Sequence, residues 1–189
     1  MFRIHSWAIV CIALMVALRI DASHRFVEYP VRPADEYANK VIAKGFIVAV
    51  EPVEDTNEQK TYFETNLSNR GILPVLIVVK NASSDTGLLD ESEVGLGQGQ
   101  DPTGTTARKT ASELGSGGLL DLSLVREVSA VRDSLVRRQL HSATFAPGGS
   151  ISGFVYVPVP TGAPRAKMHL EIPLTNEQSG ETWVTNLYF

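Results

Sequence analysis

The sequence predicts a mainly β protein, an antiparallel β-sandwich of about seven strands with one inserted amphipathic α-helix. Three observations support this fold class. Short apolar, β-branched runs recur between clusters of Gly, Pro, Asn, Asp and Ser, which is typical of strands joined by turns. The run at 72–79, ILPVLIVV, is apolar throughout, which predicts a strand buried on both faces. Over 119–140 the apolar spacing changes to that of a helix.

The strands are expected at 41–53, 72–79, 88–96, 143–145, 151–159, 167–174 and 182–187. Pro52 ends the first of them, because proline cannot continue a hydrogen-bonded ladder. Between the first two strands, Phe63 and Leu67 are four residues apart, which predicts one or two helical turns ended by Gly71. Residues 176–180, NEQSG, are expected to form the turn between the last two strands.

A tight turn is expected within 142–160, SATFAPGGSISGFVYVPVP. Pro147 presets a negative φ and the Gly148-Gly149 pair accepts positive φ, which is typical of a turn. A nucleophile elbow would need Gly-x-Ser-x-Gly between a strand and a helix, but here a strand follows and isoleucine stands at the central position. The segment is therefore interpreted as a hairpin between 143–145 and 151–159, without a catalytic serine.

Residues 97–118 are rich in Gly, Thr and Ser, which predicts a flexible loop. The inserted helix follows at 119–140. Its main apolar face carries Leu120, Leu124, Val128, Val131 and Leu135. A second face carries Leu122, Val125, Val136 and Leu140. Exposure of that second face would favour docking of a partner, whereas a helix packed flat on the sheet would be structural.

Residues 1–23 are expected to be a signal peptide or a short membrane anchor. Arg3 and His5 precede an apolar run of twelve residues, the order found in secretory signals. Twelve residues are fewer than the roughly 20 that a membrane-spanning helix needs. Ala22 suits the −1 position of a cleavage site, but Ile20 is bulky for −3, so cleavage stays open. The protein is thus predicted to be exported, periplasmic or extracellular, attached to a membrane only if this segment is retained.

The rest of the chain divides into two parts. Residues 24–40 contain two prolines and no apolar period, which predicts an extended lead-in. Residues 41–189 are expected to form the β-sandwich domain. The one cysteine, Cys11, lies in the N-terminal segment, so the exported domain is expected to contain no disulfide or thiolate metal site. The net charge of −4 gives no electrostatic reason to expect nucleic acid as a partner.

Several short sequence patterns resemble binding or modification motifs, but their residue spacing or their sequence context differs from that of the motif. Residues 95–99, GLGQG, have no following Lys-Ser/Thr and no helix after them, so a solvated loop is expected rather than a phosphate site. The acidic residues Asp85, Asp90, Glu91 and Glu93 do not alternate as calcium ligands do. The sequons at Asn66 and Asn81 are short enough to arise by chance.

The histidines are equally uninformative. His24, His141 and His169 have no second ligand at metal spacing, and His169 is expected on the solvent face of its strand. We therefore assign no catalytic, cofactor-binding or metal-binding residue, and no cofactor.

The segments at 62–81, YFETNLSNRGILPVLIVVKN, and at 142–160 together resemble a pattern in uncharacterised exported bacterial proteins. The resemblance covers residues 41–174. It implies an immunoglobulin-like sandwich in the cell envelope, but no activity and no functional residues. The helix at 119–140 departs from a bare seven-stranded sandwich.

Two classes of function are compatible with the sequence. The favoured one is a non-enzymatic cell-envelope protein, acting as a protein-interaction or structural module for an envelope protein that the sequence does not identify. The alternative is a small-molecule carrier or hydrolase whose site is assembled from scattered residues. A concave pocket with convergent ionisable groups would favour the alternative.

Overall fold

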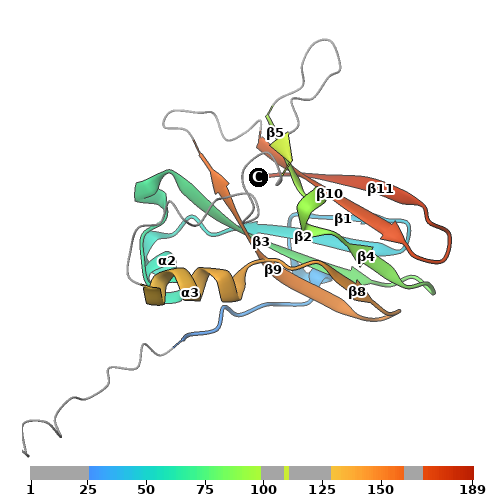
Figure 1. Ribbon diagram of the computed structural model, residues 1–189, viewed down its shortest axis with the longest axis horizontal. Helices are drawn as coiled ribbons and strands as arrows, with labels where there is room; N and C mark the ends of the chain where they lie inside the picture. The colour runs from blue at the N-terminus through green and yellow to red at the C-terminus, as the bar shows by residue number, and fades with distance from the viewer. Residues whose placement is uncertain (1–25, 99–108, 111–128, 160–167) are drawn as a thin grey trace, which may run out of the picture.

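A computed structural model of the chain describes residues 26–98, 109–110, 129–159 and 168–189. These residues form a mainly β fold with two antiparallel sheets (Figure 1). The four-stranded sheet has the order β1 (Lys40–Ala43), β2 (Phe46–Pro52), β3 (Ile72–Asn81) and β9 (Ser150–Pro158). The six-stranded sheet has the order β6 (Lys109–Thr110), β5 (Gly95–Gln98), β10 (Met168–Asn176), β4 (Gly87–Leu89) and β8 (Ala143–Phe145), with β11 (Thr182–Tyr188) also paired to β10.

The central strand β3 is buried on both faces, as predicted. One set of alternate side chains enters the core between the two sheets: Leu73, Val75, Ile77 and Val79. The other set faces a second core on the outer side of the four-stranded sheet: Ile72, Leu76 and Val78. A strand with two apolar faces needs cover on each side, so the fold requires a third layer over this sheet.

Two helices supply part of that third layer. The helix α2 (Thr56–Phe63) begins at Asp55, whose carboxylate accepts hydrogen bonds from the backbone N–H groups of Asn57 and Glu58. The helix α3 (Ser129–Arg138) contacts α2, and both lie at one end of the sheet (Figure 1). The lead-in supplies another part of the layer and runs in extended form from residue 26 to η1 (Ala34–Glu36).

The inserted helix packs on the sheet. Val131 and Leu135 of its main apolar face are buried in the outer core, which confirms the predicted face for the described part. The Tyr156 hydroxyl of β9 donates a hydrogen bond to the Leu135 carbonyl at 2.9 Å. Of the predicted second face, Val136 is exposed whereas Leu140 is buried in the core between the sheets. The helix ends at Arg138, two residues before the predicted end, and its predicted part at 119–128 lies outside the described residues.

Two of the expected strands are each divided in two. The single strand predicted at 41–53 is a hairpin of β1 and β2, because Lys44 and Gly45 both take positive φ, 51° and 82°, and reverse the chain. The strand predicted at 88–96 is interrupted by η3 (Glu91–Glu93) and becomes β4 and β5. Together with β6, these divisions account for ten strands in the described residues where about seven were predicted.

The predicted loop at 97–118 is also wrong in part. Gly97 and Gln98 belong to β5, and Lys109–Thr110 pairs with β5 as β6. The remainder of this range lies outside the described residues.

The turn at residues 146–149 does not close the hairpin that the sequence predicts. It has the expected local geometry, since Gly148 has φ 77° and the Gly149 N–H donates to the Ala146 carbonyl. However, β8 pairs with β4 and β9 pairs with β3, so the turn carries the chain from one sheet to the other. By contrast, β10 and β11 form the hairpin expected around residues 176–180.

The N-terminal segment predicted at 1–23 lies outside the described residues. Within the described part of the chain, no helix has the length and apolar character needed to cross a membrane.

Candidate functional site

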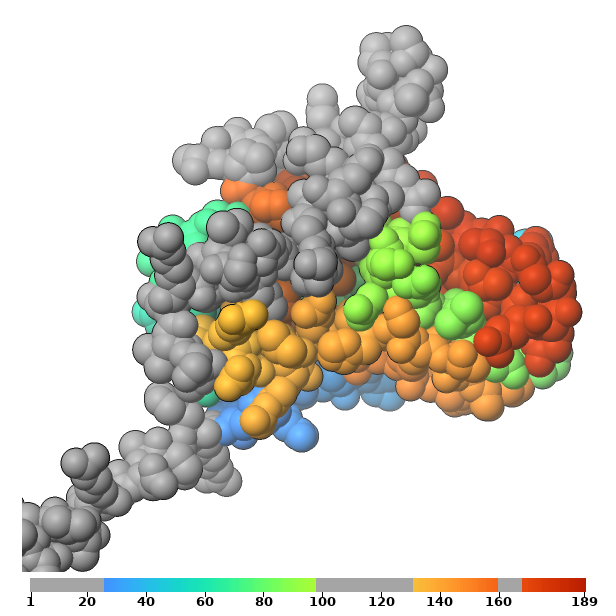
Figure 2. All heavy atoms as spheres, viewed as in Figure 1, coloured from blue at the N-terminus to red at the C-terminus, as the bar shows by residue number. Residues whose placement is uncertain are grey.

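A groove with a cavity of about 340 Å³ lies on the outer side of the four-stranded sheet. Its floor comes from β3 and β9, at Leu76 and residues 152–154. One wall is the lead-in at residues 26–31, and the other is the end of α3 with the residues after it, 137–141. The lead-in (blue) and α3 (gold) meet at the surface in Figure 2. A cavity of this size lies within the range of small-ligand pockets.

The end of α3 is fixed to β9 by close backbone contact. The Leu140 N–H donates a hydrogen bond to the Phe154 carbonyl at 2.9 Å. Gly153 permits this approach, because a Cβ atom there would lie 2.4 Å from the Leu140 Cα. This is the physical role of the glycine that follows Ser152, and it positions the groove against the sheet edge.

Arg138 joins the two walls of the groove. Its guanidinium carbon lies 3.8 Å from the centre of the Phe26 ring, and its Nη2 donates to the Val27 carbonyl. Its Nη1 donates to the Ser134 hydroxyl and carbonyl. Arg138 is only 7% exposed, and burial lowers the pKa of its guanidinium below the usual value. Its Nε is buried without a hydrogen-bond acceptor in the described part of the chain.

An unpaired buried N–H on a charged group is costly, because the desolvation of that group is not recovered. Such a group beside a cavity is the kind of feature that a bound acceptor would satisfy.

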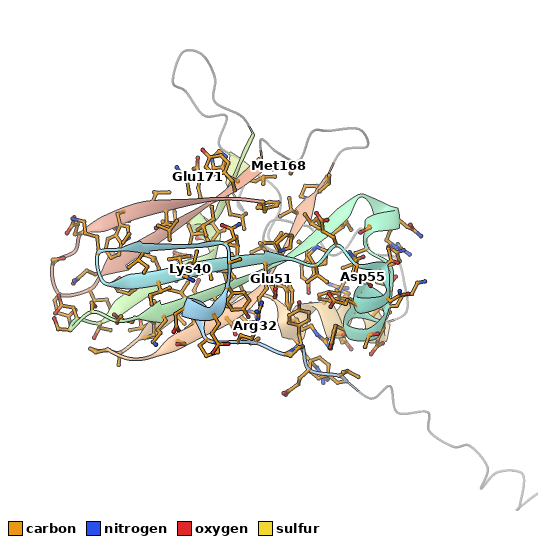
Figure 3. The ribbon with its side chains drawn as sticks, turned by 180° about the vertical axis from the view of Figure 1, so that it is seen from behind. Arg32, Lys40, Glu51, Asp55, Met168 and Glu171 are labelled. Atoms are coloured by element: carbon orange, nitrogen blue, oxygen red, sulfur yellow. The ribbon has the colours of Figure 1, made fainter. Side chains whose placement is uncertain are left out.

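The lead-in is held down by aromatic and ionic contacts. The Tyr29 ring packs edge-on against Phe154, with centroids 5.1 Å apart. Arg32 Nη2 lies 2.7 Å from Glu51 Oε1 of β2 (Figure 3), and the Arg32 guanidinium covers the Tyr37 ring. Burial, followed by the Glu51 charge, raises the pKa of the Tyr29 hydroxyl above its usual value. The lead-in is therefore a fixed wall of the groove.

A histidine and a serine share the groove. His141 Nδ1 lies 3.4 Å from Glu91 Oε2 of η3, and both His141 and Ser152 line the cavity. No hydrogen bond joins the Ser152 hydroxyl to His141 in the described residues. A nucleophile and its base need that contact, so these groups do not form a nucleophile–base pair in this conformation.

A second cluster of ionisable groups lies in the six-stranded sheet. His169 is only 3% exposed, so the prediction that it faces solvent was wrong. Its neighbours Met168 and Leu170 face the core, as strand alternation requires, but its ring lies over Gly97 of β5 and beside the Tyr188 ring. Its Nε2 lies 3.6 Å from Glu171 Oε1. The signal that sequence reasoning missed is Gly97, which leaves room for an imidazole.

The other sequence patterns have structural roles. Residues 95–98 of the GLGQG segment form β5, which corrects the expectation of a solvated loop. Asp90 caps η3, and hydrogen bonds from the Ser92 hydroxyl and N–H lower the pKa of its carboxyl group. No group of three or more His, Cys, Asp or Glu side chains in the described residues could hold a metal ion.

The two sequons differ in exposure. Asn81 is fully buried, and its amide donates to the Asp85 and Phe145 carbonyls. Asn66 is partly exposed, and its side-chain oxygen accepts from the Asn69 N–H. The Asn81 amide is thus inaccessible for modification in the folded protein.

No protein-family model matches the sequence, and a comparison with curated proteins gives no match. The solved structures with low similarity to this chain include the following two. The yjhA protein from Bacillus subtilis is 12% identical, with a TM-score of 0.39, over 78% of this chain and 95% of that chain. The structural genomics target SoR45 is 14% identical, with a TM-score of 0.33, over 76% of this chain and 82% of that chain. At these TM-scores the likeness carries no argument about function.

Proposed function

We propose that this protein is an exported, non-enzymatic binding module that holds a segment of a partner protein in the groove between the lead-in and α3. The scaffold is an immunoglobulin-like sandwich, and the partner is a cell-envelope protein. The observation that carries the proposal is the 340 Å³ cavity next to a buried arginine whose Nε has no acceptor among the described residues.

The position of α3 supports the groove rather than the helix surface as the binding site. Val131 and Leu135 are buried in the outer core and cannot contact a partner. Val136 is the one large apolar side chain exposed on the described part of the helix. A single exposed valine is too little apolar surface for docking. The groove instead combines a concave shape with aromatic and charged groups, as ligand sites do.

Export and the immunoglobulin-like scaffold rest on sequence. Residues 1–23 have the order of a secretory signal, and residues 41–174 resemble exported bacterial proteins. Amino-terminal sequencing of the protein isolated from its native cells tests the first point. A mature start near residue 23 supports cleavage, and a start at residue 1 in a membrane-free fraction contradicts export.

Site-specific photo-crosslinking tests the groove. A photoreactive residue at Val31, which lines the groove and is 46% exposed, is compared with one at Val184, which is 47% exposed on β11. The proposal predicts one defined adduct in native cells from Val31 and none from Val184. Equal labelling from both positions, or none from Val31, would reject it.

The alternative, a small-molecule carrier or hydrolase, draws on one observation: Ser152, His141 and the adjoining Glu91 are grouped at the groove. A fluorophosphonate probe reacts with activated serines and separates a hydrolase from a binding module. Under the proposed function, the probe labels the wild type no more than it labels a Ser152→Ala variant. Covalent labelling of Ser152 would establish the hydrolase instead.

A further inference from the structure

The groove carries positive charge in a protein whose net charge is −4. Arg137 and Arg138 both line it, against one acidic lining residue, Glu28. Arg137 is exposed, and its guanidinium carbon lies 5.8 Å from the centre of the Phe26 ring. Arg138 is buried, and its Nε has no hydrogen-bond partner in the described residues. Guanidinium groups that line one cavity suit a planar anion such as a carboxylate.

The end of a helix normally repels anions, because its last carbonyl groups point outward. Here three carbonyl groups of the last turns accept hydrogen bonds from within the protein. Ser134 O accepts from Arg138, Leu135 O from Tyr156, and Val136 O from Gln139. These hydrogen bonds reduce the negative charge at this end of α3, and Arg137 and Arg138 outnumber Glu28 among the charged residues that line the groove.

Aromatic side chains line the same cavity. Phe26 forms part of the lead-in wall, and Tyr29 and Phe154, which also line the cavity, pack edge-to-face. These surfaces favour an apolar group on the ligand. A cavity of about 340 Å³ therefore has a cationic part and an aromatic part within reach of one small unit.

We propose that the groove binds the free C-terminal carboxylate of a partner chain whose last residue is apolar. Such a residue carries a carboxylate and an apolar side chain on one Cα atom, which matches the two parts of the cavity. The exposed Arg137 binds the carboxylate, and the buried Arg138 guanidinium adds positive charge to the same cavity. This inference rests on the proposed function and specifies its ligand.

An NMR titration of the full-length protein tests the ligand class. The probes are the peptide acetyl-Ala-Ala-Phe with a free carboxylate and the same peptide as its C-terminal amide. The acid is expected to shift backbone amide signals at 26–31, 137–141 and 152–154 saturably, and to bind at least about tenfold more tightly than the amide. Equal affinity of acid and amide, or shifts centred elsewhere, would overturn the inference.

Two variants of one helix provide the matched comparison. Arg137→Gln removes the charge at the groove, and Arg132→Gln removes a charge from another exposed position of α3 outside the groove. Arg137→Gln is expected to weaken the acid peptide about tenfold, while Arg132→Gln leaves its affinity unchanged. Equal effects of the two variants would show general electrostatic attraction and contradict the assigned contact.

A third probe separates the two sources of a carboxylate. If 3-phenylpropionate binds as tightly as the peptide, the site takes a small free acid and the assignment to a partner chain is wrong.

Failure of the inference is distinct from failure of the proposed function. A Val31 adduct that persists while the acid and amide peptides bind alike leaves the groove a binding site but removes its carboxylate specificity.

Discussion

The guanidinium carbon of Arg138 lies 3.8 Å from the ring centre of Phe26, in the lead-in 112 positions earlier in the sequence. The same guanidinium donates to the Val27 carbonyl, so the lead-in and α3 are joined at one residue. A cation–π contact to a largely desolvated arginine contributes about 1–2 kcal/mol. The wall of the groove therefore depends on this pair.

Phe26→Ala is expected to lower the free energy of unfolding by about 1–2 kcal/mol, because the stacking partner of Arg138 is lost. Urea unfolding followed by circular dichroism measures the change. Val27→Ala is the control, since that side chain is 40% exposed and its truncation should cost less than about 0.5 kcal/mol. If both variants lose the same stability, the Arg138 contact does not hold the lead-in.

Asn81 links the end of β3 to the turn between the sheets. Asn81→Ala removes its side-chain hydrogen bonds to the Asp85 and Phe145 carbonyls and leaves buried acceptors unsatisfied. We expect a loss of about 1–3 kcal/mol in unfolding free energy. Asn66→Ala, at the partly exposed sequon, should cost much less. A small effect at Asn81 would mean that water or a shifted backbone replaces these bonds.

Substitutions at Gly97 and His169 should have non-additive effects on the free energy of unfolding. A Cβ at residue 97 would lie 2.2 Å from His169 Nε2, so Gly97→Ala is expected to destabilise by about 1–3 kcal/mol through overpacking. In a His169→Ala background the same substitution should cost clearly less, and a double-mutant cycle by urea unfolding measures the difference. If the two substitutions have additive effects on the free energy of unfolding, the cost of Gly97→Ala comes from the backbone of β5 and not from contact with the imidazole.

The burial of Tyr156 predicts that the free energy of unfolding decreases at alkaline pH. Burial raises the pKa of its hydroxyl above its usual value, so the folded protein keeps this proton while the unfolded chain releases it above pH of about 10. The stability contributed by the neutral hydroxyl is therefore complete below pH 10 and falls as the pH rises beyond it.

Comparison of the wild type with Tyr156→Phe by urea unfolding between pH 8 and 11 tests this prediction. The variant loses the hydrogen bond to Leu135 at every pH, but it should lose less additional stability above pH 10. Parallel pH profiles for the two proteins would contradict the assignment to Tyr156.

Local patterns were sufficient for much of the fold. The double-sided burial of β3 follows from its continuous apolar run, and the buried face of α3 at Val131 and Leu135 follows from helical spacing. In the turn after Phe145, Gly148 takes the positive φ that its sequence position suggests. These features depend on residues only a few positions apart in the chain, so local sequence patterns are enough to predict them.

Pairing between distant strands could not be predicted in the same way. The turn after Phe145 has the same residues whether it closes a hairpin or crosses between sheets, because the choice depends on where β4 and β3 lie. The hairpin at Lys44-Gly45 was missed because lysine rarely takes positive φ.

The groove is also a product of tertiary structure. It unites residues 26–31, 137–141 and 152–154, none of which carries a motif. One signal was present: Arg138 is three residues after Leu135, which places it on the buried side of the helix. A charged residue in that position indicates a partner, which here is the lead-in.

The most direct test of the central claim is to block the groove and repeat the crosslinking from Val31. Ser152 is exposed and lines the groove, so Ser152→Trp fills it without entering the core. Val184→Trp adds the same bulk at an exposed position on the other sheet. The proposed function predicts that the adduct disappears with Ser152→Trp and persists with Val184→Trp. An adduct of unchanged yield in the Ser152→Trp protein would show that the partner binds elsewhere.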